Sequence, residues 1–280
     1  MSAYLRPTSL GEAAAMRAEH PSFTVLAGGT DLLVASNHKA APAGIIDVFG
    51  LRDIHGIENR DDRSIRIGAA TTYAEILESE LCRHALTSLW ESAREVGALQ
   101  IQARGTVGGN IATSSPVGDT LPVWLALDAE IELISAARGS RLVRYDEFCT
   151  GYRVTELGDD ELIASIIIPP RPKGLRQFWR KMGTRRAQSI SKVMVAAAAA
   201  LDENGVVSHV RVGLGAVADR PVRARAVEAA VLGDKPGSVE ASVRAALRSE
   251  IKPIDDVRSS AAYRLTVAEN VVCRFFATLE

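Results

Sequence analysis

The stretch from Thr106 to Pro122, TVGGNIATSSPVGDTLP, combines two adjacent glycines with a series of small hydroxyl side chains. Hardly any of these side chains is large enough to contribute to a hydrophobic core. Glycine permits positive φ and lets another group approach the main chain closely. The segment is therefore expected to contain a glycine turn whose backbone meets something other than core side chains.

A second glycine motif, AGGTD at 27–31, lies between a predicted strand at 23–27 and a predicted helix at 31–38. Backbone N–H groups at the start of a helix form a ready anion site, for which phosphate is a natural ligand. The alternative for each motif is a tight turn that needs glycine and binds nothing. Two such loops could hold two phosphates, or both sides of one pyrophosphate, so the pair is more informative than either alone.

Two charged side chains have more than one interpretation. Asp119 could accept a hydrogen bond from a ribose hydroxyl or a ring N–H, or it could cap the predicted helix that begins near Thr120. Lys192 enters an otherwise apolar strand, where it could extend to water or face a ligand and stabilise negative charge. The basic run 180–186 is most simply a solvated face, and the alternative is that it meets an acidic partner or a phosphate.

A third glycine pattern, GLGAVA at 213–218, fits the dinucleotide-binding form G-x-G-x-x-A. Asp219, Arg220 and Pro221 follow at once and stop the helix that such a site requires. The pattern also follows a hairpin strand rather than the first strand of a βαβ unit. We therefore interpret it as a chance match.

The length, net charge and residue counts of the chain exclude several classes of protein. The chain has 280 residues and a net charge of −1, which leaves no broad basic surface for nucleic acid. Its three cysteines and five histidines show no spacing typical of a zinc site, an iron–sulfur cluster or a disulfide framework. The longest apolar stretch, 193–201, is too short to span a membrane, and no signal peptide opens the chain. We expect a cytoplasmic protein.

The pattern of predicted elements changes at PPRP, residues 169–172, where we place a domain boundary. Before it, short strands alternate with helices, including one long amphipathic helix. After it come three strand candidates, the last two of which form a hairpin around a DENG turn, and three helices follow, which is typical of a separate α+β domain. The predicted strands are 44–48, 64–68, 129–135, 141–144, 161–168, 175–182, 191–201 and 206–217, and the helices 71–79, 81–98, 121–127, 221–231, 237–250 and 259–279.

Taken together, AGGTDLL, TVGGNIATSSPVGDTLP, ELIASIIIP and the lysine of SKV resemble the FAD-binding, medium subunit of the molybdenum hydroxylases, the family of carbon monoxide and xanthine dehydrogenases. The resemblance covers essentially the whole chain. It implies an α+β protein with a vanillyl-alcohol-oxidase (PCMH)-type FAD-binding fold. The implied domains are two FAD-binding subdomains, 1–55 and 56–172, and a C-terminal α+β domain, 173–280.

The resemblance also implies the residues that hold a non-covalent FAD. The first loop would wrap the diphosphate and the second would approach it from the other side. Asp119 would lie near the adenosine or the flavin edge, Ile163 would contact the ring system, and Lys192 would lie near the isoalloxazine, where a cation favours the reduced ring. The implied loop residues are Ala27, Gly28, Gly29, Thr30 and Asp31, then Thr106, Gly108, Gly109, Asn110 and Thr113. Thr30 and Asp31 differ from the residues that are frequent at these positions in the family. Because the implied phosphate contacts are made mostly by the backbone, we do not expect this difference to abolish binding.

The resemblance places the substrate chemistry in other polypeptides. A large molybdenum-cofactor subunit would hydroxylate the substrate, and a small subunit with [2Fe–2S] clusters would pass electrons to the FAD. The complex is expected to be a dimer of such heterotrimers, without a transmembrane segment or nucleic acid. Two alternatives are a free-standing flavoenzyme of the same fold and a non-catalytic module that has lost its flavin.

Overall fold

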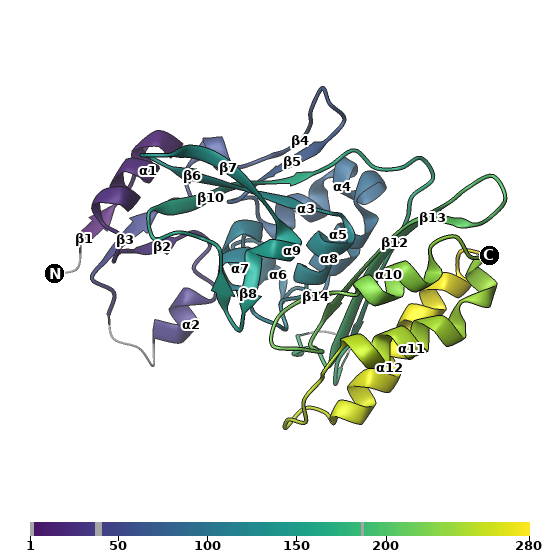
Figure 1. Cartoon of the computed structure of the whole chain (residues 1–280). Coiled ribbons are helices and arrows are strands. Elements are labelled where there is room, and N and C mark those ends of the chain that lie inside the picture. Colours follow the sequence, from purple (N-terminus) through teal and green to yellow (C-terminus); the bar gives the residue numbers. More distant parts are fainter. Residues whose placement is uncertain (1–2, 37–40, 186–187) are drawn as a thin grey trace.

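The computed structural model describes residues 3–36, 41–185 and 188–280, so Asn37 and His38 of the helix predicted at 31–38 lie outside the described residues. Three main β-sheets follow one another along the chain (Figure 1). The expected subdomain divisions at 55 and 172 fall in connections between these sheets, and as functional domain limits they stay predictions.

The first region is a small parallel sheet, in the strand order β1-β3-β2, with helix α1 beside it (Figure 1). Ser9 begins α1 because its side chain accepts a hydrogen bond from the Glu12 amide. The strands predicted at 23–27 and 44–48 are confirmed. The elements are β1 (Ala3–Leu5), α1 (Leu10–Glu19), β2 (Thr24–Leu26), α2 (Leu32–Ser36) and β3 (Gly44–Asp47).

The second region is a five-stranded antiparallel sheet in the order β4-β5-β10-β6-β7, packed against helices that include α7 and α8. The four strands predicted for this region are confirmed, and so are the helices at 71–79 and 121–127. Its elements are η1 (Arg52–Ile54), β4 (Ile57–Asn59), β5 (Ile65–Gly68), α3 (Tyr73–Glu78), α4 (Glu80–Ala85), α5 (Thr87–Ala93), α6 (Leu99–Gln102), α7 (Val107–Thr113), α8 (Leu121–Ala126), β6 (Glu130–Ser135), β7 (Gly139–Arg144), α9 (Tyr145–Phe148), β8 (Cys149–Gly151), β9 (Val154–Thr155) and β10 (Glu161–Ile168).

The prediction of one long helix over 81–98 is wrong. The chain leaves the helical conformation at Leu86, with φ −128° and ψ 54°, and separates α4 from α5. Leu86 and Leu89 are both fully buried in the same core. Apolar residues on both sides of the break face one core, so their spacing imitates that of a single amphipathic helix.

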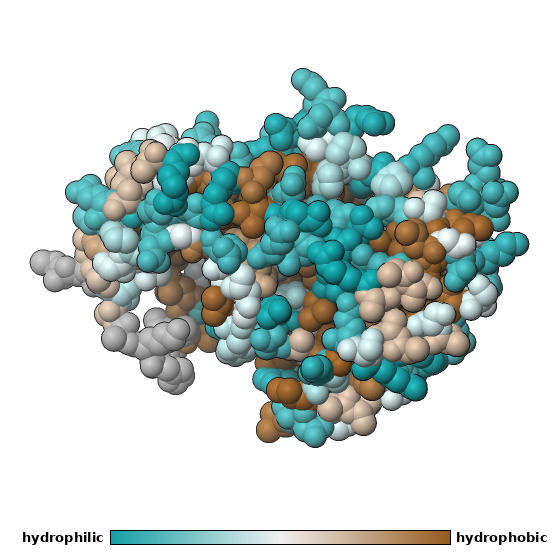
Figure 2. Space-filling view, viewed as in Figure 1, coloured by the Kyte–Doolittle hydropathy of each residue, from teal (hydrophilic) through white to brown (hydrophobic). Residues whose placement is uncertain are grey.

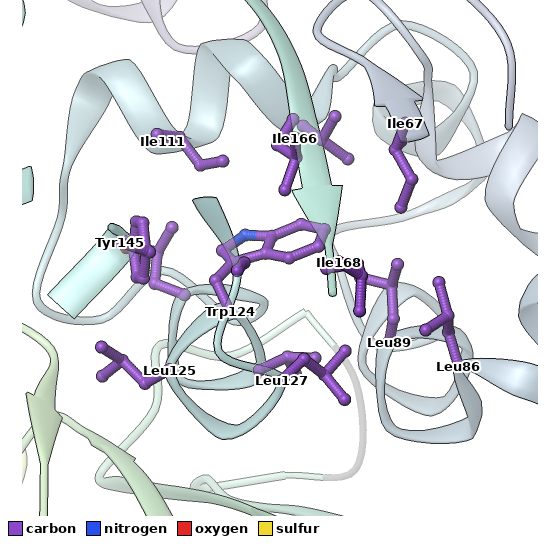
Figure 3. Packing of buried hydrophobic residues seen from close by; sticks show 14 of the residues in the cluster. Ile67, Leu86, Leu89, Ile111, Trp124, Leu125, Leu127, Tyr145, Ile166 and Ile168 are labelled. Atoms are coloured by element: carbon purple, nitrogen blue, oxygen red, sulfur yellow. The ribbon is translucent and has the colours of Figure 1, made fainter. Parts of the chain in front are cut away.

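The main core surrounds Trp124 of α8. Figure 3 shows the indole ring enclosed by aliphatic side chains that come from the sheet and from several helices, among them Ile166 of β10 and Leu89 of α5. Every residue of α8 is buried. A helix that is apolar on all sides must be covered on all sides, and α8 is covered by this core and by the C-terminal sheet.

The third region is a four-stranded antiparallel sheet, β11-β12-β13-β14, with α10, α11 and α12 on one face (Figure 1). The predicted hairpin and the three C-terminal helices are confirmed. Along β12, Val195 and Ala197 face these helices, whereas Ala196 faces the core around Trp124. The elements are β11 (Arg176–Met182), β12 (Val193–Leu201), β13 (Val207–Gly215), β14 (Val222–Arg223), α10 (Arg225–Val231), η2 (Pro236–Ser238), α11 (Glu240–Glu250) and α12 (Ala261–Ala277).

The GLGAVA pattern belongs to this packing. Gly213 and Gly215 lie at the end of β13, under the first turn of α8. A Cβ on Gly213 would lie 2.1 Å from the carbonyl oxygen of Pro122, and one on Gly215 would lie 3.0 Å from the Pro122 ring. The residues after the pattern lead to β14, with no receiving helix. These glycines are therefore explained by the close approach of α8.

The visible surface is mainly hydrophilic, with hydrophobic side chains in separate areas (Figure 2). Isolated exposed apolar side chains, such as Val257 and Leu99, are usual in folded proteins. Within the described ranges, no helix combines the length and apolar composition that a membrane crossing requires.

A buried carboxylate lies at the start of β10, the middle strand of the five-stranded sheet. Glu161 at the start of β10 has a side chain that is 2% exposed. It accepts hydrogen bonds from Arg141 Nε at 2.7 Å and from the Gly158 amide at 2.8 Å. The hydrogen bond from Arg141, aided by the Gly158 amide and Arg138, lowers the pKa of Glu161 to about 2.

This pKa predicts how stability depends on pH. Because the folded pKa lies below the unfolded value, Glu161 stabilises the fold above about pH 4.5, and this contribution is lost as pH falls toward 2. We expect Glu161→Gln to lower the free energy of unfolding at pH 7 by about 2–3 kcal/mol, allowing for the half-exposed arginine, and by little near pH 2. Urea unfolding across this range measures the difference. Glu147→Gln, at an exposed glutamate, is the control, and parallel pH profiles for all three proteins would contradict the assignment.

Candidate functional site

The first glycine motif connects β2 to α2, and two different constraints explain its glycines. Gly29 has φ +76°, in the left-handed region that favours glycine. Gly28 lies against the backbone of another segment, because a Cβ there would be 1.8 Å from the carbonyl oxygen of Arg104. Ala27 before them packs partly buried against the core of the first region. The motif is therefore a loop pressed onto residues 104–105, directly before the second motif.

The backbone of this loop carries unused hydrogen-bond donors. Among the hydrogen bonds of the described residues, none is donated by the main-chain N–H groups of residues 28–31. Backbone N–H groups in proteins almost always find a partner in the protein, water or a ligand. Thr30 is half-buried and Asp31 exposed, so the loop is open to an anion.

The second glycine motif is a helix start, so the expected glycine turn is wrong at this place. Gly108 and Gly109 lie in the first turn of α7, and Thr106 is its N-cap, accepting a hydrogen bond from the Gly109 amide at 3.1 Å. A Cβ on Gly108 would lie 2.7 Å from the carbonyl oxygen of Ala69. Glycine is needed here because α7 packs directly on the backbone that leads from β5 to α3.

The amides of the second motif already have partners. The Val107 amide donates to Thr71 at 3.1 Å, and the Gly108 amide donates to Ala69 at 2.8 Å. With the Gly109 amide bound to Thr106, the first three amides of α7 are all engaged within the protein. The two motifs look alike in sequence but differ in this respect, and phosphate binding by the second one stays a prediction.

The structure brings the two motifs together. Thr113 at the end of α7 donates a hydrogen bond to the Asp31 carboxylate at 3.3 Å. A Cβ on Gly28 would also lie 3.1 Å from the Cα of Gly105. In Figure 1, α2 and α7 accordingly lie on the same side of the molecule. The expected pairing of two distant glycine segments in one site is therefore compatible with their positions.

Asn110 connects α7 to the loop before α8. Its side-chain oxygen accepts a hydrogen bond from the Thr120 hydroxyl at 3.0 Å, and that hydroxyl lies 3.4 Å from the Tyr73 hydroxyl. Burial raises the pKa of Tyr73 well above its usual value, so this hydroxyl is neutral at physiological pH. The chain of hydrogen bonds fixes the end of the 114–120 loop.

Asp119 does not cap α8. Its carboxylate accepts hydrogen bonds from Lys181 Nζ and from the Ser191 hydroxyl, both at 2.9 Å. Thr120 occupies the N-cap position of α8, and its side chain makes no capping hydrogen bond to that helix. Burial raises the pKa of Asp119 above its usual value, although the Lys181 ammonium and the Ser191 hydroxyl act in the opposite direction. Asp119 therefore links the candidate site to the C-terminal sheet.

Ile163 and Lys192 lie on two different sheets. Ile163 is half-buried on β10, beside an irregularity in its pairing with β6. Lys192 Nζ lies 5.2 Å from the ring centroid of Tyr263 on α12, in a cation–π arrangement. No hydrogen bond or ring contact of the described residues joins either side chain to a glycine motif.

Sequence reasoning missed Lys181 and Ser191. Lys181 belongs to a run interpreted as a solvated face, yet its side chain is only 4% exposed. A signal was present in the alternation of β11, because Trp179 and Lys181 point to the same face and Arg180 to the other. A lysine on the same face as a tryptophan indicates an inward-facing cation that needs a partner.

A surface hollow lies away from the glycine motifs. It measures about 390 Å³ and is lined by the connection between β10 and β11, with Arg171, and by the end of α4. None of the glycine-motif residues lines it. Within the described ranges, no group of three or more His, Cys, Asp or Glu side chains is arranged to hold a metal ion.

Comparison with known proteins assigns the chain to a family. Residues 1–171 match the FAD binding domain in molybdopterin dehydrogenase, and residues 178–279 match the CO dehydrogenase flavoprotein C-terminal domain. The chain therefore belongs to the FAD-binding subunits of molybdenum hydroxylase-type dehydrogenases, which are oxidoreductases.

Individual relatives agree over nearly the full length. The chain is 30% identical to a xanthine dehydrogenase FAD-binding subunit of Escherichia coli O157:H7, covering 96% of this chain and 93% of the relative. It is 28% identical to the carbon monoxide dehydrogenase medium chain of Hydrogenophaga pseudoflava, covering 97% and 94%. A solved carbon monoxide dehydrogenase from that organism superposes with a TM-score of 0.90 at 30% identity, covering 98% and 95%. These matches confirm the predicted α+β, PCMH-type FAD-binding fold.

The close contact between Gly28 and the Arg104 carbonyl can be tested by a substitution that adds a single methyl group at Gly28. We expect Gly28→Ala to lower the free energy of unfolding by about 2–3 kcal/mol, because the added carbon cannot fit against a backbone carbonyl. Gly11→Ala is the matched control: Gly11 lies within α1, where a Cβ would meet no neighbouring atom within 4 Å, so alanine should stabilise by about 1 kcal/mol. Urea unfolding of both variants gives the comparison, and equal stabilities would contradict the close approach.

Proposed function

We propose that the chain is the electron-transfer subunit of a heterotrimeric molybdenum-containing hydroxylase. Its role is to hold FAD between the [2Fe–2S] clusters of a small partner subunit and an external electron acceptor. The observation that carries the proposal is the open first glycine loop, with its unused amides, in a chain that matches the FAD-binding family over both of its regions.

The first loop suits the diphosphate of FAD. A diphosphate carries negative charge and many acceptor oxygens, and residues 28–31 offer main-chain N–H groups that donate no hydrogen bond to any other described residue. Gly28 keeps the loop against residues 104–105, and Gly29 supplies the left-handed turn. Ala27 would support the loop from the core side.

The second segment contributes polar side chains beside that loop. Thr106, Asn110 and Thr113 lie on or before α7, and Thr113 contacts Asp31 directly. Gly108 and Gly109 would let α7 lie close enough for this, since Gly108 packs on Ala69. Their proposed role is to complete the diphosphate site from the second side.

Three further residues are proposed to lie along the rest of the cofactor. Asp119 would accept a hydrogen bond from the adenosine or the flavin edge, and Ile163 would provide an apolar contact for the ring. Lys192 would supply positive charge near the isoalloxazine, which favours the reduced ring. Bound FAD would provide the redox chemistry, while these side chains bind and orient it.

The relatives support the proposal of partner subunits. One relative is a medium chain and another is an FAD-binding subunit, and both are covered nearly end to end by this chain. We propose a large molybdenum-cofactor subunit, which carries the substrate reaction, and a small iron–sulfur subunit, arranged as a dimer of heterotrimers in the cytoplasm.

Charge at the first loop tests the diphosphate site. Thr30→Glu and Thr30→Gln have nearly the same shape but differ by one negative charge. We expect the glutamate variant to bind FAD at least about tenfold more weakly than the glutamine variant, because a carboxylate close to a phosphate is strongly repelled. Titration of the purified full chain, followed by flavin fluorescence, measures both dissociation constants. Equal affinities would place the diphosphate elsewhere.

The partners are tested by isolating the chain from its native source. We expect two further polypeptides to co-purify, with molybdenum and iron present in the same particle, and a mass equal to two heterotrimers. Metal analysis and native mass spectrometry supply the readout. A native preparation that contains the chain and FAD but neither metal would contradict the proposed complex.

A further inference from the structure

The surface hollow of about 390 Å³ lies where the five-stranded sheet region meets the C-terminal sheet. It is lined by the connection between β10 and β11, by the end of α4 and by the turn between β4 and β5. The connection runs beside α4 in Figure 1. Volumes of about 300–1,000 Å³ are typical of small-molecule sites. None of the residues proposed for FAD lines this hollow, so a ligand here would be separate from the flavin.

The lining of the hollow is positively charged. Arg63 comes from the turn between β4 and β5, His84 from α4 and Arg171 from the connection, and none of the described lining residues is acidic. Glu80 pairs with His84 at 3.0 Å, but both of these side chains are largely exposed. Within the described ranges, no carboxylate forms an ion pair with Arg63 or Arg171. The hollow is therefore suited to an anion.

The guanidinium of Arg171 is partly buried. Its hydrogen bond within the described part of the chain is donated to the carbonyl of Ala85, at the end of α4. Burial lowers the pKa of Arg171, and no carboxylate of the described residues acts in the opposite direction. By contrast, the hydrogen bond to Glu161 raises the pKa of Arg141. Because arginine has five N–H donors and stays charged in proteins, Arg171 has further donors for a ligand.

Arg171 is held in place by the protein itself. Pro170 and Pro172 flank it, and proline restricts both its own φ and the conformation of the residue before it. Gln177 of β11 donates to the same carbonyl of Ala85, at 2.9 Å. The end of α4 is thereby joined to the connection and to β11. A site that is ordered in this way loses less conformational entropy when a ligand binds.

We propose that this hollow binds a small organic anion through its phosphate or carboxylate groups, with Arg171 and Arg63 as the main contacts. A guanidinium donates two parallel hydrogen bonds to either group, and the volume of the hollow leaves room for an organic part. Arg63 and Arg171 belong to different segments, so a ligand that contacts both would join the FAD-binding region to the connection that leads into the C-terminal domain.

Inorganic pyrophosphate and citrate are the two probes of this site. Isothermal titration calorimetry of the purified full chain, with excess FAD present, measures the dissociation constant of each probe. We expect at least one of them to bind. Tighter binding of pyrophosphate would identify phosphate as the preferred group of the ligand, and tighter binding of citrate would identify carboxylate.

Two variants assign the binding to the hollow. We expect Arg171→Gln and Arg63→Gln each to raise the dissociation constant of the tighter probe at least about tenfold, because each removes a charged hydrogen bond to the anion. Lys173→Gln is the matched control, since it removes the same charge from an exposed residue of the same connection that does not line the hollow. It should change the dissociation constant less than about threefold, because salt screens a distant charge.

Thermal unfolding without a probe shows whether each variant is folded, and Arg63→Gln decides alone if Arg171→Gln does not fold. Absence of binding of both probes to the folded wild-type chain at about 10 mM would overturn the proposal. An affinity that Arg63→Gln leaves unchanged, or that Lys173→Gln weakens equally, would overturn it too. FAD affinity should stay at the wild-type value in Arg63→Gln, so the outcome is independent of the proposed function.

Discussion

The packing of α8 on β13 is the contact on which the rest of the structure depends. Pro122 lies over Gly213 so closely that no side chain fits between them. This approach joins the core around Trp124 to the C-terminal sheet, because one face of α8 belongs to each. It also places the loop before α8 beside the C-terminal domain, where the Ala216 amide donates to the carbonyl of Pro116 at 2.9 Å. The position of Asp119 follows from this arrangement.

Backbone proximity, rather than large side chains, also shapes the candidate site. Gly28 approaches Arg104, and Gly108 approaches Ala69. Because glycine has no side chain, two main-chain segments can lie in direct contact at each of these points, although they are far apart in sequence. Within the described part of the chain, the amides of residues 28–31 donate no hydrogen bond, whereas the amides of the second motif are used to begin a helix. Two similar sequence motifs thus have different physical roles in one site.

Local patterns predicted most elements because alternation and helical spacing follow from which face is buried. They failed where tertiary packing decides the outcome. The break at Leu86 is invisible in the spacing, since both sides of it face one core. The first turn of α7, which includes Gly108, could not be predicted from the sequence because glycine is a poor helix former. Glycine is required there because α7 lies close to the backbone of Ala69. The partner of Asp119 lies 62 residues away at Lys181, a distance over which no local rule operates. The family resemblance supplied the fold, and comparison with relatives confirmed it.

The alanine-rich strand β12 has a consequence for how the chain is made. It is buried on both faces, by α8 from the first half of the chain and by α12 from its end. During synthesis, α8 emerges long before β12 and β13, and α12 emerges last. The apolar surface of α8 therefore stays uncovered until the hairpin has been synthesised, and β12 stays uncovered on its other face until the final helix arrives. Such surfaces in partly made chains are prone to association until the elements that cover them have been synthesised.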